Sequence, residues 1–168
     1  MTKIKYIGAA LVTVLALAES AAALSCVRPN VVTSLEDAKK SEKIYQILVG
    51  QFSHAAPKPS KPRGLNEGHP PKITPSLFTG YALGSDARND QRLSRVPVEI
   101  ETSCLGPWCS SLPKSGRELI AFMELRDGEA PLLRTSVCPW WTFEARTERV
   151  EKIRECLDKS CEVAGEPW

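Results

Sequence analysis

Five short segments rich in apolar residues predict β-strands. Segment 43–52 is dense in β-branched and aromatic residues, and segment 96–102 alternates apolar with acidic positions as a half-buried strand does. Asp127-Gly128 predicts a tight turn between the last two strands. The predicted strands are residues 43–52, 77–83, 96–102, 118–125 and 131–137. Their meander-like spacing favours a mainly β fold, a five-stranded antiparallel OB-like barrel.

Two further segments predict helices, one on each side of the strands. Residues 34–42 predict a short N-terminal helix with Ser34 as N-cap. In residues 147–157, Val150, Ile153 and Leu157 recur at helical spacing among charges, which predicts an amphipathic C-terminal helix.

A proline-rich stretch separates the first two predicted strands. It contains Pro57, Pro59, Pro62, Pro70, Pro71 and Pro75 and few apolar residues, so we expect an extended loop. Too few residues precede it for a separate core. Residues 26–168 are therefore predicted to form one domain with an insert at 53–76.

The N-terminal segment has the pattern of a secretory signal peptide. Lys3 and Lys5 precede an apolar run at 7–18, and small residues follow at 20–23. The run is shorter than the roughly 20 residues that a spanning helix needs. We expect residues 1–25 to direct export to the periplasm or the outside of the cell and to be removed, with no stable membrane insertion afterwards.

Two cleavage sites fit the small residues of this segment. One cut falls before Leu24 and the other before Cys26, which would make Cys26 the mature N-terminus. Lipidation of Cys26 is a rival interpretation. It prefers Leu three residues earlier, where Ala23 stands, and it would leave an odd number of cysteines.

All six cysteines follow the predicted signal peptide, and an even count in an exported chain indicates disulfides. Cys104 and Cys109, and likewise Cys156 and Cys161, are separated by four residues, a spacing that closes a local loop easily. Six cysteines allow fifteen pairings. Spacing alone therefore leaves the connectivity open.

Metal binding and catalysis have little support. The two histidines, His54 and His69, lie in the insert without other ligand types around them, and Cys-x-x-Cys is absent. Glu99 and Glu101 fit the solvent face of a strand. We expect no enzyme, no cofactor and no metal site.

Charge and aromatic residues are unevenly distributed. Residues 54–95 carry seven basic and three acidic side chains, and residues 96–168 carry nine basic and thirteen acidic ones. Trp108, Trp140 and Trp141 flank cysteines, a position typical of rings that pack on disulfides in the core. The alternative is a ligand-stacking surface on these rings. We expect no nucleic-acid partner.

Several segments resemble the tissue inhibitor of metalloproteinases and netrin-like module. They are Cys26-Val-Arg-Pro, Ile-Leu-Val-Gly-Gln-Phe at 47–52, Cys104-Leu-Gly-Pro-Trp-Cys109, Glu-Leu-Ile-Ala-Phe at 118–122 and Leu133-Arg-Thr-Ser-Val-Cys138. The resemblance implies an OB-fold barrel whose N-terminal cysteine is tethered to the core. Together with the short spacings, it implies the pairs Cys26–Cys138, Cys104–Cys109 and Cys156–Cys161.

The resemblance also implies function. It predicts a non-catalytic module that binds a protein partner through a ridge of Cys26, Val27, Arg28 and Pro29. One alternative is a metalloprotease inhibitor that chelates zinc through the amine and carbonyl of Cys26. The family's inhibitors open with Cys-x-Cys, whereas this chain has one cysteine after Ser25. A second alternative is a binder of envelope carbohydrate, since OB folds bind such chains.

Overall fold

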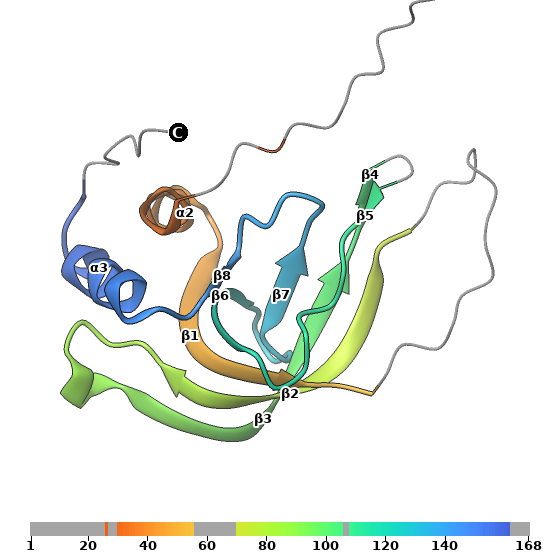
Figure 1. The fold of residues 1–168 in the computed structure, drawn as a ribbon, viewed down its shortest axis with the longest axis horizontal. Helices are drawn as coiled ribbons and strands as arrows, with labels where there is room; N and C mark the ends of the chain where they lie inside the picture. The colour runs from red at the N-terminus through yellow and green to blue at the C-terminus, as the bar shows by residue number, and fades with distance from the viewer. Residues whose placement is uncertain (1–25, 27–29, 56–69, 106–107, 162–168) are drawn as a thin grey trace, which may run out of the picture.

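The computed structural model describes Cys26 and residues 30–55, 70–105 and 108–161. The described elements in chain order are α2 (Val31–Lys40), β1 (Ile44–Ser53), β2 (Lys72–Ala82), the 3₁₀ helix η1 (Ala87–Asn89), β3 (Gln91–Thr102), β4 (Cys104–Leu105), β5 (Trp108–Cys109), β6 (Glu118–Leu125), β7 (Leu132–Thr135), β8 (Thr142–Glu144) and α3 (Thr147–Leu157) (Figure 1).

Five strands close into the expected OB-like barrel. They pair in the order β1-β2-β3-β7-β6, and β6 returns to pair with β1. Every neighbouring pair is antiparallel except β3–β7, which is parallel. An odd number of strands cannot alternate direction all the way around a closed ring. The parallel β3–β7 seam meets this requirement in a barrel that is otherwise antiparallel.

β1 and β2 approach each other most closely at a pair of facing glycines. Gly50 lies opposite Gly80, and a Cβ added to Gly50 would stand 2.3 Å from the carbonyl oxygen of Thr79. The β2–β3 register shifts between Phe78 and Gly80, so β2 is irregular at this point. Any side chain at these glycines would push the two backbones apart.

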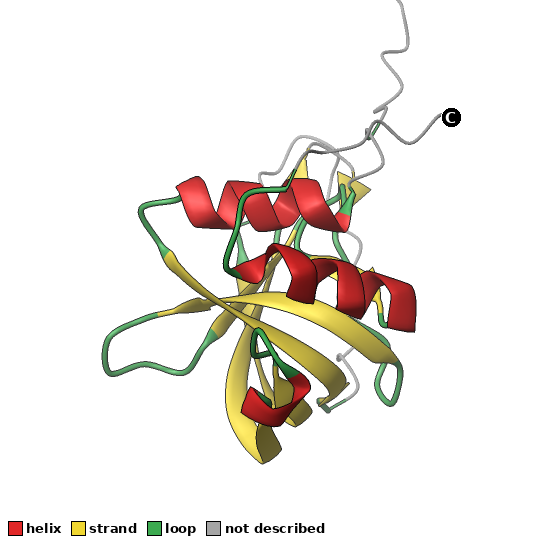
Figure 2. Ribbon diagram, turned by 90° about the vertical axis from the view of Figure 1, so that its left-hand side faces the viewer, coloured by secondary structure: helices red, strands yellow, loops and turns green. Residues whose placement is uncertain are grey.

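Two apolar clusters share the barrel wall. The interior cluster includes Phe52, Phe78 and Ile100. The second cluster lies outside, where α2 and α3 cover the outer face of β1 and β6 (Figure 2). Ile120 and Phe122 of β6 belong to this outer cluster. The helices therefore lie on one side of the barrel and leave the end that carries β4 and β5 uncovered (Figure 1).

The N-terminal helix starts earlier than its sequence indicates. Its N-cap is Asn30, whose side chain accepts from the Val32 amide at 2.9 Å. Ser34, the expected cap, lies inside the helix, fully buried, and its hydroxyl donates to the Trp140 carbonyl at 2.7 Å. Ser34 thus ties α2 to the loop before β8.

The proline-rich insert is shorter than the predicted residues 53–76. Residues 72–76 belong to β2 and pair with β3, and Ser53 is the last residue of β1. Pro75 is tolerated because β1 pairs only with Leu77–Ala82, so no second neighbour requires its missing amide. Residues 56–69 lie outside the described part of the chain.

Three disulfides staple the fold, in the pairing implied by the resemblance. The bridges are Cys26–Cys138, Cys104–Cys109 and Cys156–Cys161, so all six cysteines are bonded. Among the described residues, no helix has the length and hydrophobicity to cross a membrane.

Candidate functional site

A small hairpin projects from the uncovered end of the barrel. In it Cys104 pairs with Cys109 and Leu105 with Trp108, and the two cysteines are also joined covalently. Successive residues of a strand point to opposite faces. The disulfide therefore occupies one face, and Leu105 and Trp108 occupy the other, with 59% and 47% of their surface exposed.

Three hydroxyl groups hold the base of this hairpin against the end of β7. Ser103 and Ser110 both donate to the Thr135 carbonyl at 3.2 Å, and the hydroxyls of Ser110 and Thr135 lie 2.9 Å apart. The Thr135 hydroxyl in turn donates to the carbonyl of Glu101 at 2.9 Å. The hairpin is thus fixed at its base as well as across its two strands.

The predicted N-terminal site begins at this same end of the barrel. Cys138, three residues after Thr135, is bonded to Cys26, which is exposed. The rest of the predicted ridge, Val27, Arg28 and Pro29, lies outside the described residues. The structure therefore brings Cys26 to the segment that anchors the hairpin.

A groove of about 360 Å³ opens beside the hairpin, between the loop before β6 and the segment from β7 to β8. Gly116 in the first loop donates its amide to the Phe52 carbonyl at 3.3 Å, which attaches that loop to the end of β1. The groove is lined by Cys109, Ser110, Ser111, Leu112, Pro113, Lys114, Arg117, Leu119, Arg134, Thr135, Ser136, Val137, Pro139, Trp140, Trp141 and Thr142.

Trp140 and Trp141 make contacts within the protein, whereas Trp108 is exposed. Trp141 stacks on Tyr45 with ring centroids 4.9 Å apart and also packs against Phe122. Trp140 donates its indole N–H to Asp37 at 3.1 Å. The expected core role fits Trp141, which packs against both apolar clusters. It is wrong for Trp108, whose side chain is 47% exposed.

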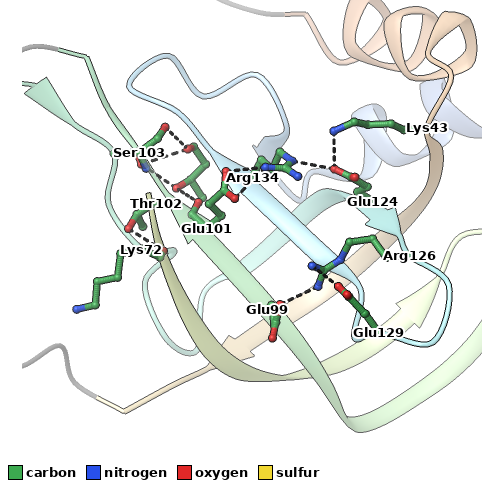
Figure 3. A network of polar contacts seen from close by, with 12 residues as sticks. Lys43, Lys72, Glu99, Glu101, Thr102, Ser103, Glu124, Arg126, Glu129 and Arg134 are labelled. Carbon is green, nitrogen blue, oxygen red and sulfur yellow. Dashed lines mark hydrogen bonds and ion pairs between the residues drawn. The ribbon is translucent and has the colours of Figure 1, made fainter. Parts of the chain in front are cut away.

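Glu99 and Glu101 of β3 and Glu124 of β6 are bound to basic side chains (Figure 3). Arg134 donates to Glu101 at 2.8 Å and to Glu124 at 2.8 Å, and Lys43 reaches Glu124 at 3.0 Å. Farther along β3, Glu99 accepts from an arginine of the β6–β7 turn at 2.7 Å. On this face of the barrel the carboxylates are therefore not free. They belong to a row of ion pairs, which we call the ion-pair ladder.

Glu124 is the most buried acid of this ladder, with 8% of its surface exposed. Burial raises the pKa of Glu124, but hydrogen bonds from Arg134 and Lys43 together outweigh it and hold the pKa below its ordinary value. The bond to Glu124 raises the pKa of Arg134 in return. Both groups are therefore charged at neutral pH, and they lock β6 to β7.

No metal centre is assembled in the part of the chain that the structure describes, where no three His, Cys, Asp or Glu side chains come together. His54 follows β1, and its Nδ1 is buried without a hydrogen-bond partner among the described residues. His69 lies outside them. This end of the barrel presents one exposed indole ring, hydroxyl groups and basic side chains.

Sequence reasoning missed Leu105 as a candidate binding residue and preferred a core role for Trp108 over a ligand-stacking one. The signal was present in the spacing, because a disulfide between residues 104 and 109 of a two-stranded hairpin sends residues 105 and 108 to the face opposite the sulfurs. Comparison of the chain with protein-family models, with curated proteins and with solved structures found no match.

Proposed function

We propose that this chain is an exported, disulfide-stapled module that binds a protein partner, without catalysis, through the end of the barrel that carries the β4–β5 hairpin. One observation carries the proposal. The hairpin closed by Cys104–Cys109 holds Leu105 and Trp108 with about half of their surface exposed, at 59% and 47%.

Exposed tryptophan on a rigid support is characteristic of protein-binding surfaces. Trp is among the residues most enriched at binding hot spots. The disulfide and the hydroxyl contacts of Ser103, Ser110 and Thr135 restrict the hairpin before any partner arrives. Little conformational entropy is then lost on contact, which favours affinity.

The proposed location and family rest on the disulfides. Three bridges fit an oxidising compartment, which supports a secreted or periplasmic protein. A closed OB-like barrel with Cys26 bridged to Cys138 supports a netrin-like module. Because Val27, Arg28 and Pro29 follow Cys26 directly, we propose them as a second part of the same binding edge.

A second candidate is inhibition of a metalloprotease through Cys26. The favouring observation is that Cys26 is exposed even though it is bridged to Cys138. Zinc chelation by its amine requires Cys26 to be the first residue of the exported protein. N-terminal sequencing of that protein decides the matter: a start at Cys26 keeps this candidate, and a start at Leu24 excludes it.

Site-specific photocrosslinking tests the main proposal. A photoreactive phenylalanine analogue is placed at Leu105, which keeps Trp108 in place, and in a control at Lys152 of α3, an exposed position on the helix-covered side. Both exported proteins are irradiated in the medium or envelope fraction of the producing cells. We expect a discrete protein adduct from position 105 that is absent from position 152. Identical adducts at both positions, or none at 105, would contradict the proposal.

A further inference from the structure

We propose that the groove beside the hairpin, between residues 109–119 and 134–142, binds an acidic segment of the protein partner in which aspartate or glutamate alternates with apolar residues. This inference rests on the proposed function and names the chemistry of its partner. The groove lining contains Lys114, Arg117 and Arg134 and no acidic residue.

The positive charge of the groove is not cancelled by its surroundings. Arg117 and Arg146 share one carboxylate, that of Glu144, at 3.2 and 3.0 Å, which leaves a surplus positive charge. Lys114 is exposed and belongs to none of the ion pairs among the described residues. The surplus therefore lies at Lys114 and Arg117.

Arg134 contributes more to the shape of the groove than to its net positive charge. Its guanidinium is held by Glu101 and Glu124 at 2.8 Å each, and these two carboxylates offset it and Lys43. The ion-pair ladder thus keeps the β7 side of the groove rigid. The charge that a ligand meets comes from the opposite side, the loop before β6.

The floor of the groove is apolar, which distinguishes a peptide from a simple anion. Leu112, Leu119 and Trp141 line the groove and also pack on the interior cluster of the barrel. Pro113 and Val137 add apolar walls. A volume of about 360 Å³ lies in the range of ligand pockets. An inorganic anion would leave these surfaces wet, whereas apolar side chains beside a carboxylate would cover them.

The groove is continuous with the hairpin. Cys109 and Ser110 line it, and Cys109 directly follows Trp108. The ring of Trp108 lies on the hairpin face opposite the disulfide, so a partner that covers it reaches the groove by passing over the edge of the hairpin at Cys109 and Ser110. The hairpin would supply apolar anchoring, and the groove would select for acidic sequence.

The test uses a synthetic peptide and the full exported protein. The probe is an acetylated, fluorescently labelled heptapeptide in which glutamate alternates with leucine, and its twin carries glutamine at every glutamate. Binding is measured by fluorescence anisotropy, and the site is located by the indole N–H resonances of Trp140 and Trp141. We expect only the acidic peptide to bind and to shift these resonances, with affinity that falls as salt rises.

Substitutions at the two surplus charges have matched controls elsewhere. Lys114→Ala and Arg117→Ala should each weaken the acidic peptide about two- to fivefold, as for exposed ion pairs, and together about tenfold. The controls are Lys152→Ala and Arg88→Ala, exposed basic residues that each form an exposed ion pair. They should leave affinity unchanged. Far-UV circular dichroism confirms that all four variants are folded.

Each other outcome overturns the inference. Equal binding of the glutamine peptide, or unchanged affinity for the acidic peptide after both groove substitutions, would show that the groove does not recognise acidic side chains. A concentration-dependent dimer that Lys114→Ala disrupts would assign the groove to a second copy of the chain. Absence of acidic-peptide binding while crosslinks persist at position 105 would refute this inference and leave the proposed function standing.

Discussion

Removal of the Cys26–Cys138 bridge should destabilise the protein far more than removal of Cys104–Cys109. The first bridge joins residues 112 positions apart and the second joins residues 5 positions apart. In the loop-entropy description, the long loop contributes about 4.8 kcal/mol and the short one about 2.1 kcal/mol at 25 °C. The expected difference of about 2.7 kcal/mol is large beside the 5–15 kcal/mol typical of a whole domain.

Urea unfolding followed by far-UV circular dichroism measures this difference. The two variants replace both cysteines of one bridge with serine, so that no new free thiol remains. Cys26, Cys104 and Cys109 are at least partly exposed and Cys138 is half-buried, so lost packing adds little. The third bridge is a poor comparator because Cys156 is fully buried. Equal losses from the two variants, or a larger loss from the short loop, would refute the reasoning.

Three further predictions concern the barrel and its helices. Gly50→Ala should lower the free energy of unfolding by about 1–3 kcal/mol in urea titration, because its Cβ would stand 2.3 Å from the Thr79 carbonyl oxygen. Although burial raises the pKa of Glu124, its two basic partners hold that pKa below the ordinary 4.5. The ionised carboxylate of Glu124 should therefore stabilise the fold fully above pH 4.5, and this stabilisation should be lost as the pH falls through the lower pKa of the folded state. Glu124→Gln should flatten this part of the acid-unfolding curve. Ser34→Ala should cost about 1–3 kcal/mol in thermal unfolding, since it leaves the Trp140 carbonyl without its donor.

Elements with strong local patterns were predictable from sequence. β6 and α3 have the predicted bounds, 118–125 and 147–157, because β6 is a continuous apolar run buried on both faces and α3 buries one face at helical spacing. β1 differs from its prediction by one residue at each end. In these segments local preference and tertiary packing favour the same conformation.

The extended ends of β2 and β3 were not predictable in the same way. The stretch 72–76 contains Pro75, and Leu93 is the only apolar residue of the stretch 91–95, so neither has a strand pattern. Both are strands because β2 and β3 pair along one long ribbon, in which 72–76 lies opposite 98–102 and 91–93 lies opposite 80–82. The left-handed backbone of Arg95, φ 53°, marks the bulge that lets this ribbon twist.

The candidate site, too, was predictable from sequence only in its local part. The sequence indicated the local Cys104–Cys109 loop, but the groove depends on how the β7–β8 segment leaves the barrel wall. β6 pairs with β7 only at Glu124 and with β8 only at Leu119–Ala121. Between them the chain departs from the sheet, and that departure depends on packing between segments far apart in sequence.

The affinity of the captured partner for the Trp108→Ala variant tests the central claim most directly. Trp108 is 47% exposed in the free protein, so its removal should leave the unfolding midpoint nearly unchanged. If the hairpin end is the binding surface, the variant should bind the partner about thirtyfold or more weakly by biolayer interferometry, the loss expected of a hot-spot tryptophan. An affinity within twofold of the parent protein would contradict the account.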